Sequence, residues 1–122
     1  MPMEEPRSLE ECFASFDERW QPRIVTRVND YDVKIAHVEG EYVEHVHDDT
    51  DEYFHVLAGE LTLTLPGEGR SVVIAAGEVF TVPRGVSHQP SAAPGTRILM
   101  FEPRGTLNDG DLGGGTAGEA VS

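Results

Sequence analysis

The amino-acid sequence predicts an all-β domain, an antiparallel sandwich or jelly-roll barrel, preceded by one short helix. The first observation is texture: from residue 24 to residue 102, segments rich in Val, Ile, Thr, Leu, Phe and Tyr alternate with Gly, Pro and Asn-Asp breaks. The second is spacing, because short strands at close, regular intervals are typical of antiparallel sheets rather than parallel sheets with helices. The third is length, since 122 residues suit one domain with one core.

Nine segments have the composition of strands, and turn-forming residues separate them. They are residues 24–28, 32–39, 42–47, 52–58, 60–65, 70–74, 78–82, 86–92 and 96–102. Asn29-Asp30 is the expected turn between the first two strands. Five apolar side chains are expected to fill the barrel interior: Phe54, Val56, Leu63, Val79 and Met100.

Residues 8–19 have the pattern of a short amphipathic helix. Ser8 followed by Glu11 resembles a capping box at a helix N-terminus, and Pro22 ends the pattern. The apolar residues recur at spacings of three and four and therefore share one helix face: Leu9, Cys12, Phe13, Phe16 and Trp20. Two interpretations suit this face, a partner-binding or dimer helix and a cover over one end of the barrel. The cover is the favoured interpretation.

The last part of the chain differs in composition from the predicted barrel. From Gly105 onward, glycines lie among Thr, Asp and Ala with hardly any large apolar side chain. Such a composition does not offset the entropy of ordering, so disorder is expected from residue 110 onward. The expected organisation is an N-terminal helical segment at 1–22, a barrel at 23–104 and a flexible glycine-rich tail at 105–122.

The charge balance is strongly acidic, with 22 Asp and Glu against 9 Lys and Arg and a formal net charge of −13. Such a surface repels phosphate backbones, which argues against nucleic acid and membrane as partners and mildly against highly anionic substrates. No apolar run approaches the ~20 residues of a membrane-spanning helix. Cys12 is the only cysteine, and residues 1–7 lack the layout of a signal peptide, so a cytoplasmic location is expected.

Three histidines and one carboxylate occur at spacings that suit a metal site. His45 and His47 are two residues apart, so both side chains would project from the same face of a strand. Glu52 shares the parity of the expected core residues on the next strand, and a carboxylate there must be paired or bound to a cation. His88 follows a Pro-Arg-Gly turn at the expected barrel rim. With open positions for water or substrate, this set suits Fe, Mn, Ni, Cu or Zn.

The region around the first two histidines resembles the first motif of the cupin superfamily. It has a glycine, a His-x-His pair, a Glu after four residues and a glycine after six more, at Gly40, His45, His47, Glu52 and Gly59. Four residues separate Gly40 from His45 where the usual pattern has five. The departure is minor because no ligand position changes.

The second cupin motif has its counterpart around the third histidine. The spacing of glycine, proline, glycine and histidine is matched at Gly77, Pro83, Gly85 and His88. The asparagine that closes the motif is missing, and Ala92 stands in its place. That asparagine is not a metal ligand in the family, so its loss leaves the ligand set intact.

The resemblance implies a double-stranded β-helix that is often dimeric and holds one divalent transition metal inside the barrel. It carries over four metal ligands, namely His45, His47, Glu52 and His88. The chain is similar to the small, mannose-6-phosphate isomerase-like cupins, but its single lysine, Lys34, and its acidic charge give that activity no independent support. A homodimer and a small-molecule ligand or substrate are the partners the resemblance implies.

Three classes of function remain open at the level of the sequence. The leading one is a metal-dependent enzyme, an oxygenase or an isomerase, acting on a small organic molecule, in which Glu52 either stays a ligand or acts as a base. The alternative is a non-catalytic module that senses or stores a small ligand or the metal. A barrel that only supports dimerisation is the third, and the intact ligand set argues against it.

Three further side chains were weighed for the site. His55 is out of phase with Glu52 and is expected to face away from the metal. His37 is expected to be an ordinary hydrogen-bonded histidine on an earlier strand. Arg84 is expected to lie at the rim, paired with one of the many acids, with the binding of a substrate carboxylate as the alternative.

Overall fold

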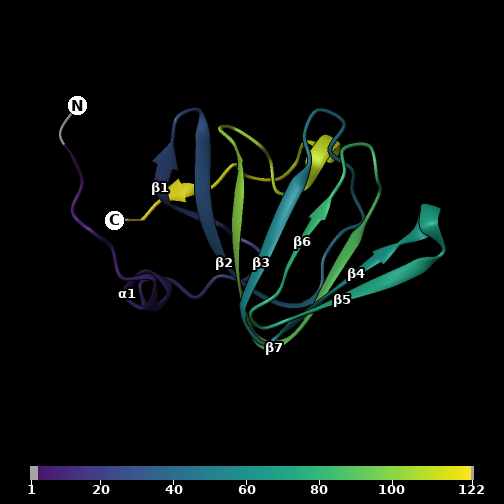
Figure 1. Ribbon diagram of the computed structural model, residues 1–122, viewed down its shortest axis with the longest axis horizontal. Helices are drawn as coiled ribbons and strands as arrows, with labels where there is room; N and C mark the ends of the chain where they lie inside the picture. The colour runs from purple at the N-terminus through teal and green to yellow at the C-terminus, as the bar shows by residue number, and fades with distance from the viewer. Residues whose placement is uncertain (1–2, 122) are drawn as a thin grey trace.

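The computed structural model describes residues 3–121 and consists mainly of β-strands, with one short α-helix (Figure 1). The prediction of an all-β, jelly-roll fold behind a short helix is confirmed. The helix α1 spans Leu9–Ala14. The strands are β1 Arg23–Val28, β2 Tyr31–Glu41, β3 Glu52–Ala58, β4 Glu60–Leu65, β5 Arg70–Ala75, β6 Val79–Val82, β7 Gln89–Pro103 and β8 Glu119–Ala120.

The long strand β7 joins the two layers of the fold. Its C-terminal part pairs antiparallel with β2 and β3, and its N-terminal part pairs with β4. In one layer the strands β1, β2, β7, β3 and β6 lie side by side (Figure 1). The strands β4 and β5 form the other layer, which the N-terminal part of β7 joins. Within residues 3–121 the sheet does not close, since β5 pairs only with β4 and β6 only with β3. The predicted strands 86–92 and 96–102 are one continuous strand, with Gly95 at φ 79° between them.

Strand alternation places the main core between the two layers. On β2, Ala36 and Val38 face this core, whereas Ile35 faces the other side of the sheet. The buried core residues come from six strands: Ala36, Val38, Phe54, Val56, Leu61, Leu63, Leu65, Ile74, Val82, Ile98 and Met100. The expectation for Val79 was wrong, because Phe80 and Val82 are the residues of β6 that pack against the core, and Val79, of the opposite parity, is 55% exposed.

Helix α1 is shorter than the predicted 8–19 and covers the outer face of β2. Ser8 caps it, with Glu11 N donating to Ser8 Oγ at 3.2 Å. The helix ends after Ala14, where Ser15 Oγ donates to Cys12 O at 2.7 Å and competes with the helical hydrogen bonds. A second core of Cys12, Phe13, Val25 and Ile35 lies beneath the helix. The helix thus covers a face of the sheet, not an end of the barrel.

Residues 42–47 do not form the predicted strand. Only His45 forms a bridge, exchanging two backbone hydrogen bonds of 2.9 Å with His88. Tyr42 N donates to Pro90 O at 2.9 Å, so the segment runs alongside residues 88–90. It makes fewer backbone hydrogen bonds with them than two paired β-strands would. The segment is an irregular connection between β2 and β3.

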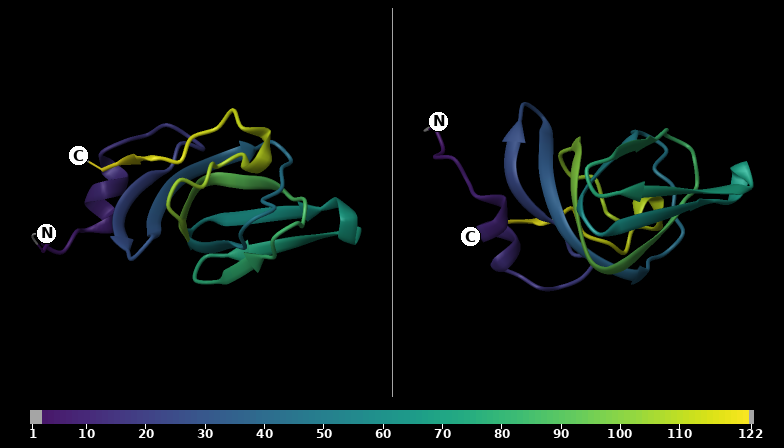
Figure 2. Two further views of the ribbon diagram at one scale, coloured as in Figure 1. Left: turned by 90° about the horizontal axis from the view of Figure 1, so that it is seen from above. Right: turned by 60° about the horizontal axis from the view of Figure 1, so that its bottom comes forward.

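The C-terminal segment runs back across the molecule from the barrel to β1 (Figure 2). It contains a 3₁₀ turn at Gly110–Leu112, and β8 pairs parallel with β1. Asn108 Nδ2 donates to Trp20 O at 2.7 Å. The composition of this segment gave no sign of these contacts, and its flexibility and the three-part division of the chain stay predictions.

No helix within residues 3–121 is both long enough and apolar enough to cross a membrane.

Candidate metal centre

Four side chains from three parts of the fold converge between the two layers. His45 and His47 come from the connection before β3, Glu52 is the first residue of β3, and His88 directly precedes β7. One ligand atom from each lies within 4.8 Å of the others. All four residues are buried, with exposed fractions between 0 and 6%. The structure therefore brings together the four residues that the sequence predicted as ligands.

Backbone hydrogen bonds hold the two histidine segments together. In addition to the His45–His88 bridge, Gly85 N donates to His47 O at 2.8 Å. Gly85 has a φ of 79°, a left-handed conformation that glycine adopts at little cost. The Pro-Arg-Gly turn therefore reverses the chain at the point where His88 can reach the centre.

Hydrogen bonds at Nδ1 orient the imidazole rings of His45 and His88. Nδ1 of His45 lies 2.8 Å from Val43 O, and Nδ1 of His88 lies 3.0 Å from Val86 O. A carbonyl oxygen only accepts, so each Nδ1 donates. In neutral His45 the Nε2 then keeps a free lone pair, whereas Nε2 of His88 is hydrogen-bonded to Glu52 Oε1 at 2.8 Å. Histidines that bind metals are commonly oriented by such a bond from the other nitrogen.

The Glu52 carboxylate lies between the rings. Oε1 is 2.8 Å from His88 Nε2, and Oε2 is 2.7 Å from His47 Nε2. Burial alone would raise the pKa of Glu52, but the hydrogen bonds and charges of His47 and His88 outweigh burial and lower it to about 2. The carboxylate is therefore ionised throughout the physiological range and available to a cation.

This environment shifts the pKa values of His45 and His47 in opposite directions. Burial lowers the pKa of His45. Burial would also lower the pKa of His47, but the adjacent Glu52 outweighs it and raises that pKa above its ordinary value. In the absence of a metal, a proton on His47 would compensate the charge of Glu52.

The donor set fits a divalent transition metal. The Nε2 atom of His45 is buried and has no hydrogen-bond partner, whereas Nε2 of His47 lies 2.7 Å from Glu52 Oε2. A buried polar atom without a partner is costly, and Nε2 of His45 lies 4.0 Å from the charged carboxylate of Glu52. Three imidazoles and one carboxylate suit Fe, Mn, Ni, Cu or Zn.

A small cavity adjoins the four residues. Its free volume is about 30 Å³, and His45 and Glu52 form part of its wall. Most of the wall is apolar and comes from Ala36, Val38, Phe54, Pro90, Ile98 and Met100. The remainder includes Trp20 and Tyr42, whose rings stack 4.8 Å apart, and Asn108 of the C-terminal segment.

A buried ion pair near the centre was missed by the sequence analysis. Lys34 Nζ lies 2.9 Å from Glu102 Oε1, and the two side chains are 0% and 2% exposed. Burial and the nearby Glu52 raise the pKa of Glu102 to about 7 although Lys34 opposes them. Lys34 has the parity of Ala36 on the same strand, and this parity was the one signal in the sequence that could have placed it inside.

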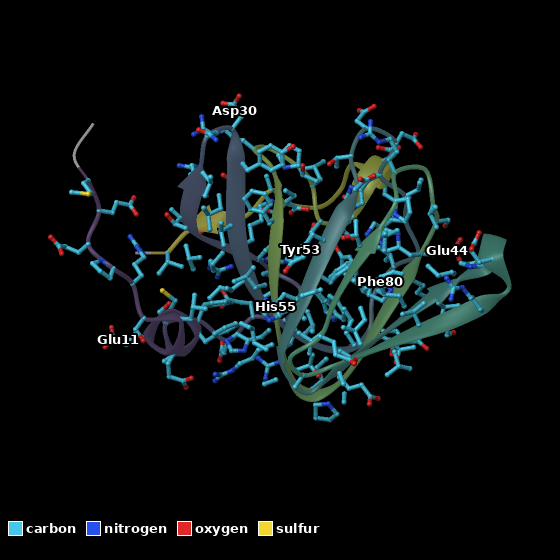
Figure 3. All side chains as sticks on the ribbon, viewed as in Figure 1. Glu11, Asp30, Glu44, Tyr53, His55 and Phe80 are labelled. Carbon is cyan, nitrogen blue, oxygen red and sulfur yellow. The ribbon has the colours of Figure 1, made fainter. Side chains whose placement is uncertain are left out.

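Three further side chains near the predicted site, His37, His55 and Arg84, lie outside the cluster of four. His55 is on the outer face of β3, where it is labelled in Figure 3 with Tyr53. His37 Nε2 lies 2.9 Å from Phe13 O and packs against the ring of Phe13. Arg84 is exposed, and its Nε lies 3.6 Å from Asp51 Oδ1. The expectations that His55 and His37 are not ligands and that Arg84 pairs with an acid at the rim agree with these positions.

Residues 32–101 match the Cupin domain family, and this match covers more than half of the chain. The chain belongs to this family and carries a buried His/Glu cluster of the kind that binds metals. Its membership in the narrower mannose-6-phosphate isomerase-like group stays a prediction.

Three known proteins place the chain within the family. It is 37% identical over 78 residues to the Bacillus subtilis (strain 168) protein YdbB, across 64% of this chain and 68% of that protein. It is 39% identical over 67 residues to 3-hydroxyanthranilate 3,4-dioxygenase of Xanthomonas euvesicatoria pv. vesicatoria (strain 85-10), across 53% of this chain. That match spans only 38% of the dioxygenase. The crystal structure of a cupin-2 domain containing protein from Shewanella frigidimarina NCIMB 400 superimposes with a TM-score of 0.77 and 38% identity, covering 80% of this chain and 94% of that one.

Proposed function

We propose that this chain is a metal-dependent oxygenase that acts on a small organic molecule. In this proposal His45, His47, Glu52 and His88 hold one divalent metal ion. The observation that carries it is the convergence of four buried ligand atoms within 4.8 Å, of which the Nε2 of His45 has no hydrogen-bond partner. The similarity to 3-hydroxyanthranilate 3,4-dioxygenase supports an oxygenase over an isomerase.

Different residues of the chain have different roles in such a site. A divalent transition metal, when bound, supplies Lewis-acid and redox chemistry. Imidazole nitrogens of His45, His47 and His88 would hold the cation, and Glu52 would supply the one negative charge. The apolar cavity beside His45 and Glu52, of about 30 Å³, has room only for a water-sized group, whereas the pocket of about 280 Å³ beside His47 has room for a small organic substrate. Glu52 remains the candidate base, since its carboxylate belongs to both the ligand set and the cavity wall.

Metal content and turnover test the two parts of the proposal separately. The purified protein, stripped of metal and reloaded with Fe(II), is expected to bind one metal ion per chain by elemental analysis. The loaded protein is expected to consume O₂ in an oxygen electrode with at least one member of a panel of small diols and diones. Metal binding with no O₂ consumption and no isomer formation across the panel would favour the sensing or storage module instead.

A variant pair distinguishes loss of the site from loss of the fold. Replacing His88 by Ala removes a buried ligand, whereas replacing His55 by Ala changes a histidine on the outer face of the same layer. The H88A variant is expected to lose both metal and O₂ consumption, while H55A keeps both. Equal metal content in the two variants would contradict the ligand assignment.

We infer a homodimer and a cytoplasmic location as the setting for this activity. Cupins are often dimeric, and the chain has one cysteine and a strongly acidic composition. Light scattering coupled to size exclusion tests the dimer directly. A single monomer mass over a range of protein concentrations would overturn it.

A further inference from the structure

The pocket of about 280 Å³ adjoins the candidate metal centre at His47. Its lining comes from two parts of the chain, namely residues 48–50 before β3, and residues 104–107 and 110–111 after β7. His47, which is 6% exposed, is the only one of the four candidate metal ligands that lines it. A molecule in this pocket would therefore lie directly beside the metal centre.

The lining of this pocket carries charges of both signs. The acidic side chains are Asp48, Asp49 and Asp111, and the one basic side chain is Arg104. Within residues 3–121 none of these four side chains forms an ion pair, although the chain has 22 Asp and Glu. A ligand with both signs of charge would give a partner to the guanidinium and to the carboxylates. A ligand with negative charge alone would be opposed by the three aspartates.

The backbone anchors the charged segments of the lining to the barrel. Thr106, two residues after Arg104, accepts a hydrogen bond of 2.9 Å at its carbonyl oxygen from Nζ of the buried Lys34. Asp111 N donates to Val46 O at 3.0 Å. Both segments are therefore held in place before a ligand arrives, which lowers the cost of binding.

We propose that the pocket beside His47 binds a small zwitterion of the amino-acid class, with its carboxylate at Arg104 and its ammonium group at the aspartates. A volume of about 280 Å³ suits a molecule of only a few carbons. Leu107 is the one large apolar side chain of the lining, and no Phe, Tyr or Trp among the described residues contributes to it. An aliphatic ligand therefore fits better than an aromatic one. As a substrate site the pocket rests on the proposed function, because the metal would supply the chemistry.

Four molecules of nearly the same shape separate the two charges. Alanine carries both, lactate carries only the carboxylate, alaninamide carries only the ammonium group, and lactamide carries neither. Each is titrated at neutral pH into metal-loaded and metal-free protein, and the Kd is taken from the NMR shifts of backbone amides. Alanine is expected to bind about three- to fivefold more tightly than each of the others, which is the effect of one exposed ion pair.

Two variants test the two ends of the pocket separately. Arg104→Gln is expected to weaken the binding of alanine and lactate by about three- to fivefold and to leave alaninamide and lactamide no weaker. Asp111→Asn is expected to weaken alanine and alaninamide but not lactate. The control Arg70→Gln removes the same charge from an exposed position outside the lining and is expected to leave all four affinities unchanged.

Three results would overturn the inference. One is binding of lactate, alaninamide or lactamide to the unmodified protein that equals or exceeds the binding of alanine. Another is an alanine affinity that Arg104→Gln leaves unchanged. The third is an order of affinities found only with metal present, because it would assign the discrimination to chelation by the probes.

The proposed function fails in a different way. None of the four charged side chains is a candidate metal ligand, so the same order of affinities is expected in metal-free protein. That order in a protein that takes up no metal by elemental analysis would remove the proposed function and support the zwitterion pocket. Metal uptake without binding of any of the four molecules would do the reverse.

Discussion

The Lys34→Met variant perturbs the buried ion pair that lies nearest to the candidate metal centre. Lys34 is 0% exposed and Glu102 is 2% exposed, and the second carboxylate oxygen of Glu102 has no hydrogen-bond partner. Methionine fills a similar volume but leaves the carboxylate without its cation. Removing one member of a buried pair typically costs about 3 to 5 kcal/mol of unfolding free energy. For a chain of this length that loss corresponds to a fall in Tm of roughly 10 to 20 °C.

The cost of Lys34→Met is expected to depend on pH. Burial and Glu52 raise the pKa of Glu102 to about 7, against an unfolded value of 4.5. The folded state therefore binds the extra proton, and its contribution to stability, complete below pH 4.5, is lost as pH rises through 7. At about pH 6 Glu102 is largely protonated and needs no cation, whereas at about pH 8 it is ionised. The stability deficit of Lys34→Met is therefore larger at the higher pH.

Thermal and urea unfolding of metal-free protein, followed by circular dichroism, measures both quantities. Metal is removed first because a ligand bound to the folded state adds its own stability. Arg84→Met is the matched control, since its partner Asp51 lies 3.6 Å away on the surface and the Arg84 side chain is 65% exposed. That surface pair is expected to contribute no more than about 1 kcal/mol. A loss below about 1 kcal/mol for Lys34→Met at pH 8, or equal losses at both pH values, would refute the reasoning.

Three further predictions concern the metal centre and its cover. His47→Ala is expected to abolish metal uptake measured by elemental analysis while keeping the circular dichroism spectrum, and retained metal at full occupancy would contradict the ligand role. Because Glu52 raises the pKa of His47 above 6.5, protons compete for that nitrogen, and metal affinity in competition titrations should weaken as pH falls from 7 to 5. A Cβ at Gly110 would lie 2.2 Å from Val46 O, so Gly110→Ala should cost about 2 kcal/mol, and Gly113→Ala, which meets nothing within 4 Å, about 1 kcal/mol. Equal losses from the two glycine variants in urea unfolding would count against close packing of the C-terminal segment.

The convergence of the four candidate ligands was predictable because it depends on local spacing. His45 and His47 project to one region, and Glu52 follows the alternation of β3, so short-range parity was sufficient. The strand assumed for 42–47 was wrong, yet both rings still point inward, because the single bridge to His88 orients the segment. Parity on β3 likewise predicted the outward position of His55 correctly.

The remaining features depend on pairings between distant parts of the chain. Lys34 and Glu102 are 68 positions apart, and each alone reads as a surface charge in an acidic sequence. The two residues lie on neighbouring strands, β2 and β7. Local composition does not encode the pairing of strands that are so far apart in the sequence. Asn108 contacts Trp20 across 88 positions in the same way. These pairings require the assembled sheet before they stabilise anything.

The C-terminal segment packs against the candidate metal ligands. Asp111 N donates to Val46 O at 3.0 Å, and a Cβ at Gly110 would lie 3.3 Å from His45 Cδ2. The segment therefore lies directly against a predicted ligand, although it is outside the residues that match the family. Under the proposed function the candidate ligands belong to the shared barrel, so the choice of substrate would come from the groups around them, which here include Trp20 and Asn108. Exchanging these two terminal segments between cupins should thus change ligand selection more than metal affinity.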